Sequence, residues 1–203
     1  TNVNVTSKED LKEFSKLPFA VDFGVESGSS EILQLMNKTT DPPRFLSRHK
    51  KLVEACTELS IPSKSYFIWG FPGETKQTLR ETLKYQNVML RIAEKHHHIE
   101  VAGQFFFLAP GSDVYENMTH YSDRYGTVFR VRDWWRYVTR NLRMLASSVD
   151  PSSDLSLEEE NEIVSDEFME GLNRIHNDKM RHYRWISAKL MSHVNETPII
   201  SAT

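Results

Sequence analysis

The sequence contains a single cysteine, Cys56, among its 203 residues. One thiol excludes an internal disulfide and any metal site that needs several cysteine ligands. The chain also has no apolar run of membrane-spanning length and no charged segment followed by an apolar leader. Its formal net charge of -3 gives no overall attraction to nucleic acid or to an anionic membrane. These absences favour a cytoplasmic globular protein without membrane association.

A short apolar stretch at residues 65–71 is expected to be the central strand of the fold. Hydrophobic residues make up 39% of the sequence, which is enough for a buried core. The stretch is apolar without alternation, which predicts a parallel strand covered by helices on both faces. Gly70 then begins a glycine- and proline-containing turn, and Thr75 can cap a helix that starts at Lys76.

The turn after this strand is a candidate ligand site. In parallel α/β folds, ligands bind beyond the carboxyl ends of the strands. Gly70 lets the backbone come close to a ligand or adopt a positive φ. A well-formed turn without any ligand is the alternative, with about equal weight.

An earlier strand, residues 19–26, alternates between large and small or acidic side chains. Phe23 and its alternate neighbours share one face, while Asp22, Gly24 and Glu26 share the other. Buried carboxylates are costly unless they are hydrogen-bonded, so a polar ligand or network is expected beside Asp22 and Glu26. A solvated edge strand is the alternative.

Helical and strand patterns follow each other in a βαβαβ order. Helices are expected at residues 31–37, from Pro42 and from Lys76, and a third strand at 99–108. Within the second helix, His49 and Cys56 fall on the apolar face and are expected to pack rather than react. A metal site at residues 96–98, three successive histidines, is disfavoured because three consecutive side chains cannot all face one ion.

Three segments together resemble a known family. Residues 24–29 (GVESGS), 67–75 (FIWGFPGET) and 108–112 (LAPGS) resemble, in order and spacing, strands four, five and six of the radical S-adenosylmethionine (SAM) superfamily. They are most similar to its cobalamin-binding, methylthiotransferase and cyclase-like branch. The resemblance covers residues 2–118 and implies an α/β fold, a partial (β/α) TIM-type barrel with SAM across the carboxyl ends of its strands.

The resemblance also implies roles for particular residues. Glu26 matches the polar residue that binds the SAM ribose, with Ser27 beside it, and Lys38 falls where a basic residue binds the methionine carboxylate. On the second strand Ile68 matches the contact to adenine. The cofactor-binding residues thus expected are Glu26, Ser27, Lys38, Tyr66, Ile68, Gly70, Phe107, Leu108 and Ala109.

The family's CxxxCxxC motif, which holds a [4Fe-4S] cluster, is absent from this sequence. Iron–sulfur ligation needs several thiolates, so a chain with one cysteine cannot hold the cluster by itself. The sequence is therefore interpreted as the C-terminal half of a radical SAM barrel, inactive alone, with no catalytic or metal-binding residue of its own. The intact parent would use SAM and [4Fe-4S], with cobalamin as an optional further cofactor, on a substrate that the sequence does not identify. A degenerate barrel that binds a nucleotide or a partner is the alternative.

The remaining residues are expected to form a helical C-terminal extension. We divide the chain into residues 1–120, the partial barrel, and residues 121–203, the extension. Helices are expected over residues 131–145, within an acidic region at 144–173 and over 171–193, with a linker at 151–153. The missing N-terminal half of the same protein is the expected partner. Without it, exposed strand edges near Phe107 predict a homodimer or an extension folded over the barrel.

Overall fold

The computed structural model describes residues 2–16, 20–96, 98–136 and 147–168. The chain divides into two compact units, each described by itself below. The first comprises residues 1–69 with 80–104, and the second comprises residues 70–79 with 105–203. The boundary expected at residue 120 stays a prediction.

The first unit alternates helices and strands, as the sequence predicts. Its elements are α1 (Lys8–Phe14), β1 (Val21–Glu26), α2 (Ser30–Leu35), α3 (Pro42–Glu58), β2 (Ser63–Trp69), most of α4 (Lys76–Ala93) and β3 (Ile99–Phe105). Helix α1 begins with a capping box in which Ser7 and Asp10 each bind the other's backbone amide. Strand β3 ends three residues earlier than expected.

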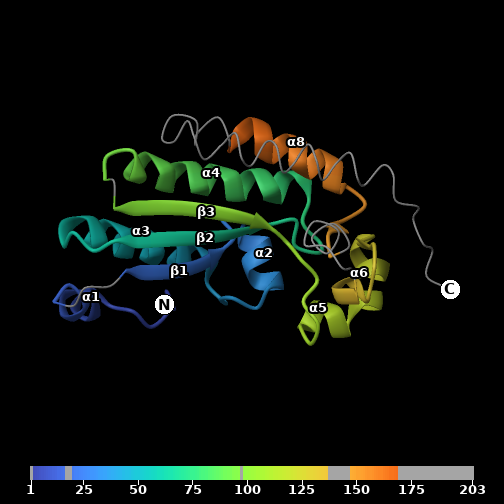
Figure 1. Ribbon diagram of the computed structural model, residues 1–203, viewed down its shortest axis with the longest axis horizontal. Helices are drawn as coiled ribbons and strands as arrows, with labels where there is room; N and C mark the ends of the chain where they lie inside the picture. The colour runs from blue at the N-terminus through green and yellow to red at the C-terminus, as the bar shows by residue number, and fades with distance from the viewer. Residues whose placement is uncertain (1, 17–19, 97, 137–146, 169–203) are drawn as a thin grey trace. The chain divides into compact units, whose positions relative to one another are not determined.

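The three strands form one sheet in chain order, β1-β2-β3. Strands β1 and β2 pair in parallel, with Val21 opposite Ser63, and the arrows of all three strands point the same way (Figure 1). The carboxyl ends of the strands therefore lie at one edge of the sheet. The prediction of three adjacent parallel strands in chain order is confirmed, and the fold is α/β.

The sheet has one buried face and one open face. Along β2, Ser63, Ser65, Phe67 and Trp69 are buried, whereas Lys64 and Ile68 are half-buried and Tyr66 is 38% exposed. Both α3 and α4 contact the buried face, through hydrogen bonds of His49 to Ser65 and of Trp69 to Gln86. The prediction that helices cover this strand on both faces is wrong for the described residues, because both helices lie on the same side.

A buried histidine joins α3 to the sheet and to α4. The Tyr85 hydroxyl donates to the carbonyl of Leu46 at 2.8 Å, so His49 Nδ1 donates to that hydroxyl at 2.8 Å. His49 Nε2 then accepts from the Ser65 hydroxyl at 3.0 Å. Burial lowers the pKa of His49 to about 3, which keeps the ring neutral. As expected from the sequence, His49 is a packing residue.

Removing the Tyr85 hydroxyl should destabilise this network. In Tyr85→Phe the His49 Nδ1 proton loses its acceptor inside the core, which costs about 1–3 kcal/mol of unfolding free energy. Urea unfolding followed by circular dichroism measures the change. Tyr125→Phe, which removes a hydroxyl outside this network, is the matched control and should change stability by less than about 0.5 kcal/mol. Equal effects of the two substitutions would contradict this account of His49.

The second unit is built from short elements. They are α5 (Asp113–Glu116), α6 (Met118–Tyr125), β4 (Val128–Phe129), the 3-10 turn η1 (Trp134–Arg136), β5 (Val149–Asp150) and α8 (Leu157–Glu167). Strands β4 and β5 pair antiparallel. The rings of Phe106 and Tyr121 both meet Phe71 edge-on, at 5.4 and 6.2 Å between centroids, and form the aromatic part of this core. Ser112 caps α5 through its side chain, which accepts from the Tyr115 amide.

Several expected helices fall largely outside the described residues. Of the helix expected at 131–145 the structure describes only residues 131–136, in which η1 is a single 3-10 turn. The helix expected at 171–193 lies wholly outside. Among the described residues, none of the helices combines the length and apolarity needed to cross a membrane.

Candidate functional site

Glu26, at the carboxyl end of β1, has an unusual backbone conformation. Its φ is +70°, in the left-handed region that residues other than glycine rarely adopt. The pairing with β2 shifts register between Gly24 and Glu26, which marks a β-bulge. Bulges and left-handed residues cost free energy and occur often at binding sites, where they direct a side chain. Here the bulge changes the direction in which the Glu26 side chain points.

The turned side chain places the Glu26 carboxylate over Gly24. A Cβ atom on Gly24 would lie 2.6 Å from Glu26 Oε1, so glycine leaves room for the carboxylate in its present position. The same oxygen accepts a hydrogen bond from Lys38 Nζ at 2.8 Å. The two side chains keep 23% and 28% of their surface exposed, so a solute can reach both. The structure thus brings together two of the expected site residues as an ion pair.

The loop after Glu26 is fastened to α4 by side-chain hydrogen bonds. Ser27 is fully buried, and its hydroxyl lies 2.7 Å from the Thr82 hydroxyl. Thr82 also accepts from the Gly28 amide, and Ser29 donates to Glu81 at 2.7 Å. The Ser27 hydroxyl therefore positions the loop that follows Glu26. Its expected contact with a ligand stays a prediction.

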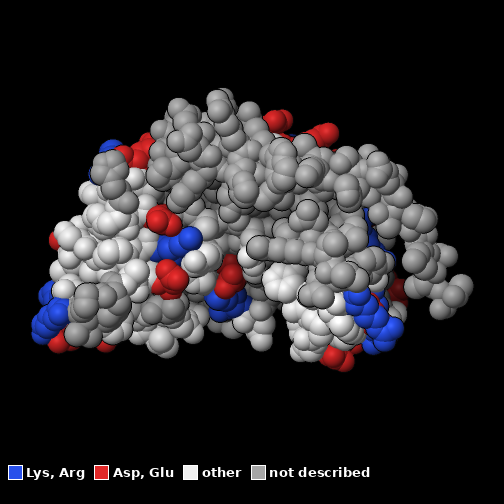
Figure 2. Space-filling model, in the orientation of Figure 1, with Lys and Arg blue, Asp and Glu red and all other residues white. Residues whose placement is uncertain are grey.

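Tyr66 and Ile68 lie on the open face of the sheet. Tyr66 is opposite Gly24 in the register, so it shares the face over which the Glu26 carboxylate lies. Lys64 lies 5.0 Å from the centroid of the Tyr66 ring and pairs with Glu100 at 3.4 Å. Figure 2 shows acidic and basic side chains close together over this region. This open face presents hydrogen-bonding and apolar surface side by side.

The other expected site residues belong to the second unit. Gly70 has φ +72° and donates its amide to Glu74 Oε2 at 2.6 Å. Leu108 is buried, with its amide bound to the Ser147 carbonyl and its carbonyl accepting from the Trp134 indole. Phe107 is 47% exposed, and Ala109 is half-buried. The Phe107 ring meets Trp134 edge-on at 6.3 Å, which is one contact with the expected extension. A homodimer stays a prediction.

The segment expected to be a linker, residues 151–153, instead packs on the turn after β2. Pro151 accepts from the Gly73 amide at 2.7 Å, and the Ser152 hydroxyl donates to the Glu74 carbonyl at 2.7 Å. Pro151 and Ser152 are buried. These polar groups find backbone partners far away in the sequence, and the role of the segment as a linker between two helices stays a prediction.

The same segment also binds the first turn of α4. Asp154 accepts from the Lys76 amide at 3.0 Å, and the Lys76 ammonium pairs with Glu159 at 2.7 Å. Ser156 and Glu159 form a capping box for α8, a signal that was readable in the sequence. Two fully buried carboxyls, Glu74 and Glu160, were not predicted as functional residues.

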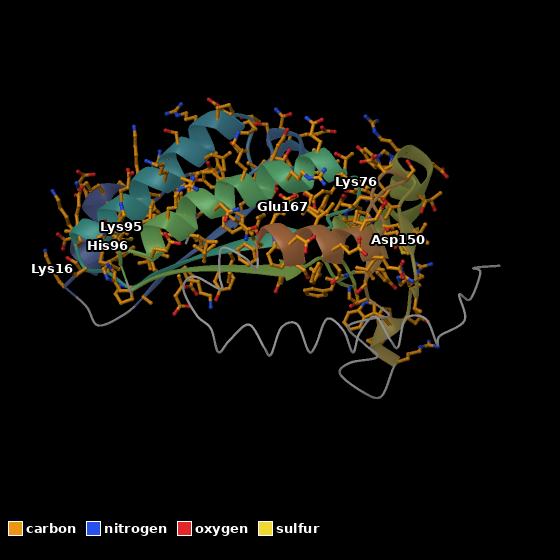
Figure 3. All side chains as sticks on the ribbon, turned by 90° about the horizontal axis from the view of Figure 1, so that it is seen from above. Lys16, Lys76, Lys95, His96, Asp150 and Glu167 are labelled. Carbon is orange, nitrogen blue, oxygen red and sulfur yellow. The ribbon has the colours of Figure 1, made fainter. Side chains whose placement is uncertain are left out.

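The described residues contain no group of three or more metal-binding side chains that could hold an ion. Burial raises the pKa of the Cys56 thiol to about 11, so this cysteine does not supply a thiolate. His96 lies beyond the end of α4 opposite to Lys76, away from the carboxyl ends of the strands (Figure 3), and His98 directly precedes β3. Glu26 and Lys38 offer a carboxylate and an ammonium group to a solute, whereas the described residues do not fit an iron–sulfur cluster.

The sequence is similar to known proteins over its first part. The model of the radical SAM superfamily matches residues 1–85. The ribosomal protein uS12 methylthiotransferase RimO of Chromobacterium violaceum is 39% identical over 75 residues, which are 37% of this chain and 16% of that protein. The tRNA-2-methylthio-N(6)-dimethylallyladenosine synthase of Clostridium botulinum is 34% identical over 73 residues, 36% of this chain and 16% of that protein.

A third relative gives the same result. The tRNA-2-methylthio-N(6)-dimethylallyladenosine synthase of Syntrophus aciditrophicus is 33% identical over 87 residues, 39% of this chain and 18% of that protein. The matched stretch thus spans about one sixth of the length of these relatives. None of these matches supports the alternative of a degenerate, non-enzymatic barrel. These matches over the first part of the chain support a member of the radical SAM superfamily, in its methylthiotransferase branch.

Proposed function

We propose that this chain contributes strands four to six of a partial radical SAM barrel, together with part of the SAM site. The observation that carries the proposal is the Glu26–Lys38 pair at the carboxyl end of β1, held by a bulge and accommodated by Gly24. A strained backbone at a strand end, with two accessible charges of opposite sign, fits a zwitterionic ligand.

Each residue has a definite role in this proposal. The Glu26 carboxylate accepts hydrogen bonds from the ribose hydroxyls, and the Lys38 ammonium pairs with the methionine carboxylate. Ile68 packs on the adenine. In the free protein Glu26 and Lys38 neutralise each other, so ligand binding exchanges one ion pair for two new contacts.

The iron–sulfur cluster must come from polypeptide outside this sequence, because its one cysteine is buried and protonated. In this superfamily SAM supplies radical chemistry when it is bound at such a cluster. The intact protein is then a radical SAM enzyme. The similarity to methylthiotransferases makes transfer of a methylthio group to a macromolecule the first reaction to assay.

We expect the chain alone to bind S-adenosylhomocysteine only weakly, with a dissociation constant on the order of 1 mM, because only part of the pocket is present. Amide chemical-shift titration by NMR measures such binding and locates it. Shifts should begin at Glu26, Lys38 and Ile68, and Glu26→Ala should abolish them. Glu31→Ala is the control. It changes an exposed residue of α2, the next helix along the chain, and should leave the shifts unchanged.

Two results would contradict the proposal in different ways. Shifts confined to residues distant from β1 and β2, or none at saturating ligand, would exclude a SAM site at Glu26. Micromolar affinity that Glu26→Ala removes would show a complete pocket rather than part of one.

A further inference from the structure

Two buried glutamates meet the backbone of Gly70 in the second unit. Glu74 comes from the turn after β2 and has no exposed surface, and Glu160 comes from α8 with 1% exposed. A Cβ atom on Gly70 would lie 2.4 Å from both carboxyl oxygens of Glu160. The Gly70 amide donates to Glu74 Oε2 at 2.6 Å. One glycine is therefore in contact with both acids.

Each acid has one carboxyl oxygen that lacks a hydrogen-bond partner among the described residues. These oxygens are Glu74 Oε1 and Glu160 Oε1, both buried. A buried charge without a partner is costly, and two adjacent carboxylates repel each other as well. A single proton between the two acids would give both oxygens a partner at once.

The charged groups around the pair leave no cation for it. Asp150, on β5, accepts from Arg130 Nη2 at 2.9 Å and from the Leu157 amide at 3.0 Å. Lys76, at the start of α4, pairs with Glu159 at 2.7 Å. Among the described residues no lysine or arginine forms an ion pair with Glu74 or Glu160, and Asp150 adds negative charge nearby.

We infer that Glu160 is protonated at neutral pH and donates a hydrogen bond to Glu74, the acid of the pair that ionises first, so that a shared proton holds α8 to the turn at residues 70–75. Glu74 is the first of the two acids to ionise because backbone amides of Gly70 and Phe71 donate to its carboxylate. Among the described residues no backbone amide is found that lowers the pKa of Glu160 in this way, so Glu160 keeps the proton. Glu160 is thereby a positioning residue for the turn that contains Gly70, and it lies outside the stretch that matches the superfamily.

The electrostatics agree with this assignment. Burial raises the pKa of Glu74 to about 8, against the opposing effect of the two amide hydrogen bonds. Burial raises the pKa of Glu160 well above its ordinary value, and the charges of Glu74 and Asp150 raise it further. A glutamate whose pKa is raised by folding binds more protons in the folded than in the unfolded chain. The stability that it contributes is present at low pH and is lost as pH rises from about 4.5 through the folded pKa.

The test compares Glu160→Gln, Glu160→Ala and the unchanged 203-residue chain by urea unfolding between pH 6 and pH 9. A glutamine amide can donate to Glu74 as the protonated acid does. For the unchanged chain the unfolding constant should rise by up to about tenfold per pH unit for one proton. Glu160→Gln should be nearly as stable at pH 6 and lose most of this dependence, whereas Glu160→Ala should be destabilised throughout. Glu158→Gln, exposed on the same helix, is the matched control and should behave as the unchanged chain.

Infrared spectroscopy supplies an independent measurement. The unchanged chain at pH 7 should show a protonated carboxyl band that Glu160→Gln lacks and Glu158→Gln retains. If that band is missing, or if Glu160→Gln is as unstable as Glu160→Ala or does not fold, the proposal is overturned. It is equally overturned if calcium or magnesium stabilises the unchanged chain but not Glu160→Gln, because the pair would then be a cation site.

Discussion

Replacing Gly103 with alanine is expected to lower the free energy of unfolding by about 3 kcal/mol, among the largest effects of any small substitution in the first unit. A Cβ atom on Gly103 would lie 2.0 Å from Cζ2 of Trp69 and 2.5 Å from two more atoms of the ring. The ring is 5% exposed, and its Nε1 donates to Gln86 Oε1 at 2.8 Å. The ring cannot move away without breaking this hydrogen bond and losing its position beside α4.

A double-mutant cycle with Trp69→Phe tests this contact specifically. The smaller ring leaves space for the alanine methyl group, so Gly103→Ala should cost at least about 1 kcal/mol less when combined with Trp69→Phe than alone. Urea unfolding of the four proteins measures the coupling. Additive costs would mean that Gly103 and Trp69 do not pack as described.

Local sequence signals were enough to predict the elements of the first unit. The proline at position 42 and the alternation along β1 specify a helix start and a strand face by short-range chemistry. Which face of β2 the helices cover was not predictable from such local signals. Ser63 and Ser65 are small polar residues on the buried face. Ser65 can be buried there because its hydroxyl forms a hydrogen bond with His49, which belongs to α3.

The candidate site was predictable only in part for the same reason. The resemblance pointed to Glu26 and Lys38, and the structure brings them within 2.8 Å. The left-handed backbone at Glu26 and the need for glycine at position 24 depend on the bulge, which no pattern in the sequence indicates. The partner of Ser27, Thr82, lies 55 residues away.

The role of the C-terminal segment was missed, although one signal was present. Leu157, Glu160 and Val164 recur at helical spacing and are all buried, so a glutamate stands within an apolar stripe. A charged residue at such a position needs a special partner. That partner, the turn at residues 70–75, is too distant in the sequence to be identified from it.

The second large effect is expected at this contact. Gly70→Ala should lower the free energy of unfolding by about 4 kcal/mol, from two separate causes. A residue with a Cβ atom at φ +72° costs about 1–2 kcal/mol in the left-handed region. The remainder comes from overpacking, because the new methyl group would meet both oxygens of Glu160 at 2.4 Å in a buried site.

Gly111→Ala separates these two causes. Gly111 has nearly the same backbone angle, φ +78°, but a Cβ atom there would meet nothing within 4 Å. It should therefore cost only the backbone contribution, about 1–2 kcal/mol. Thermal unfolding of both variants measures the difference, which isolates the contact with Glu160. Equal costs would mean that the Glu160 carboxyl moves away freely, and α8 would then not be fastened to the turn by a buried pair of acids.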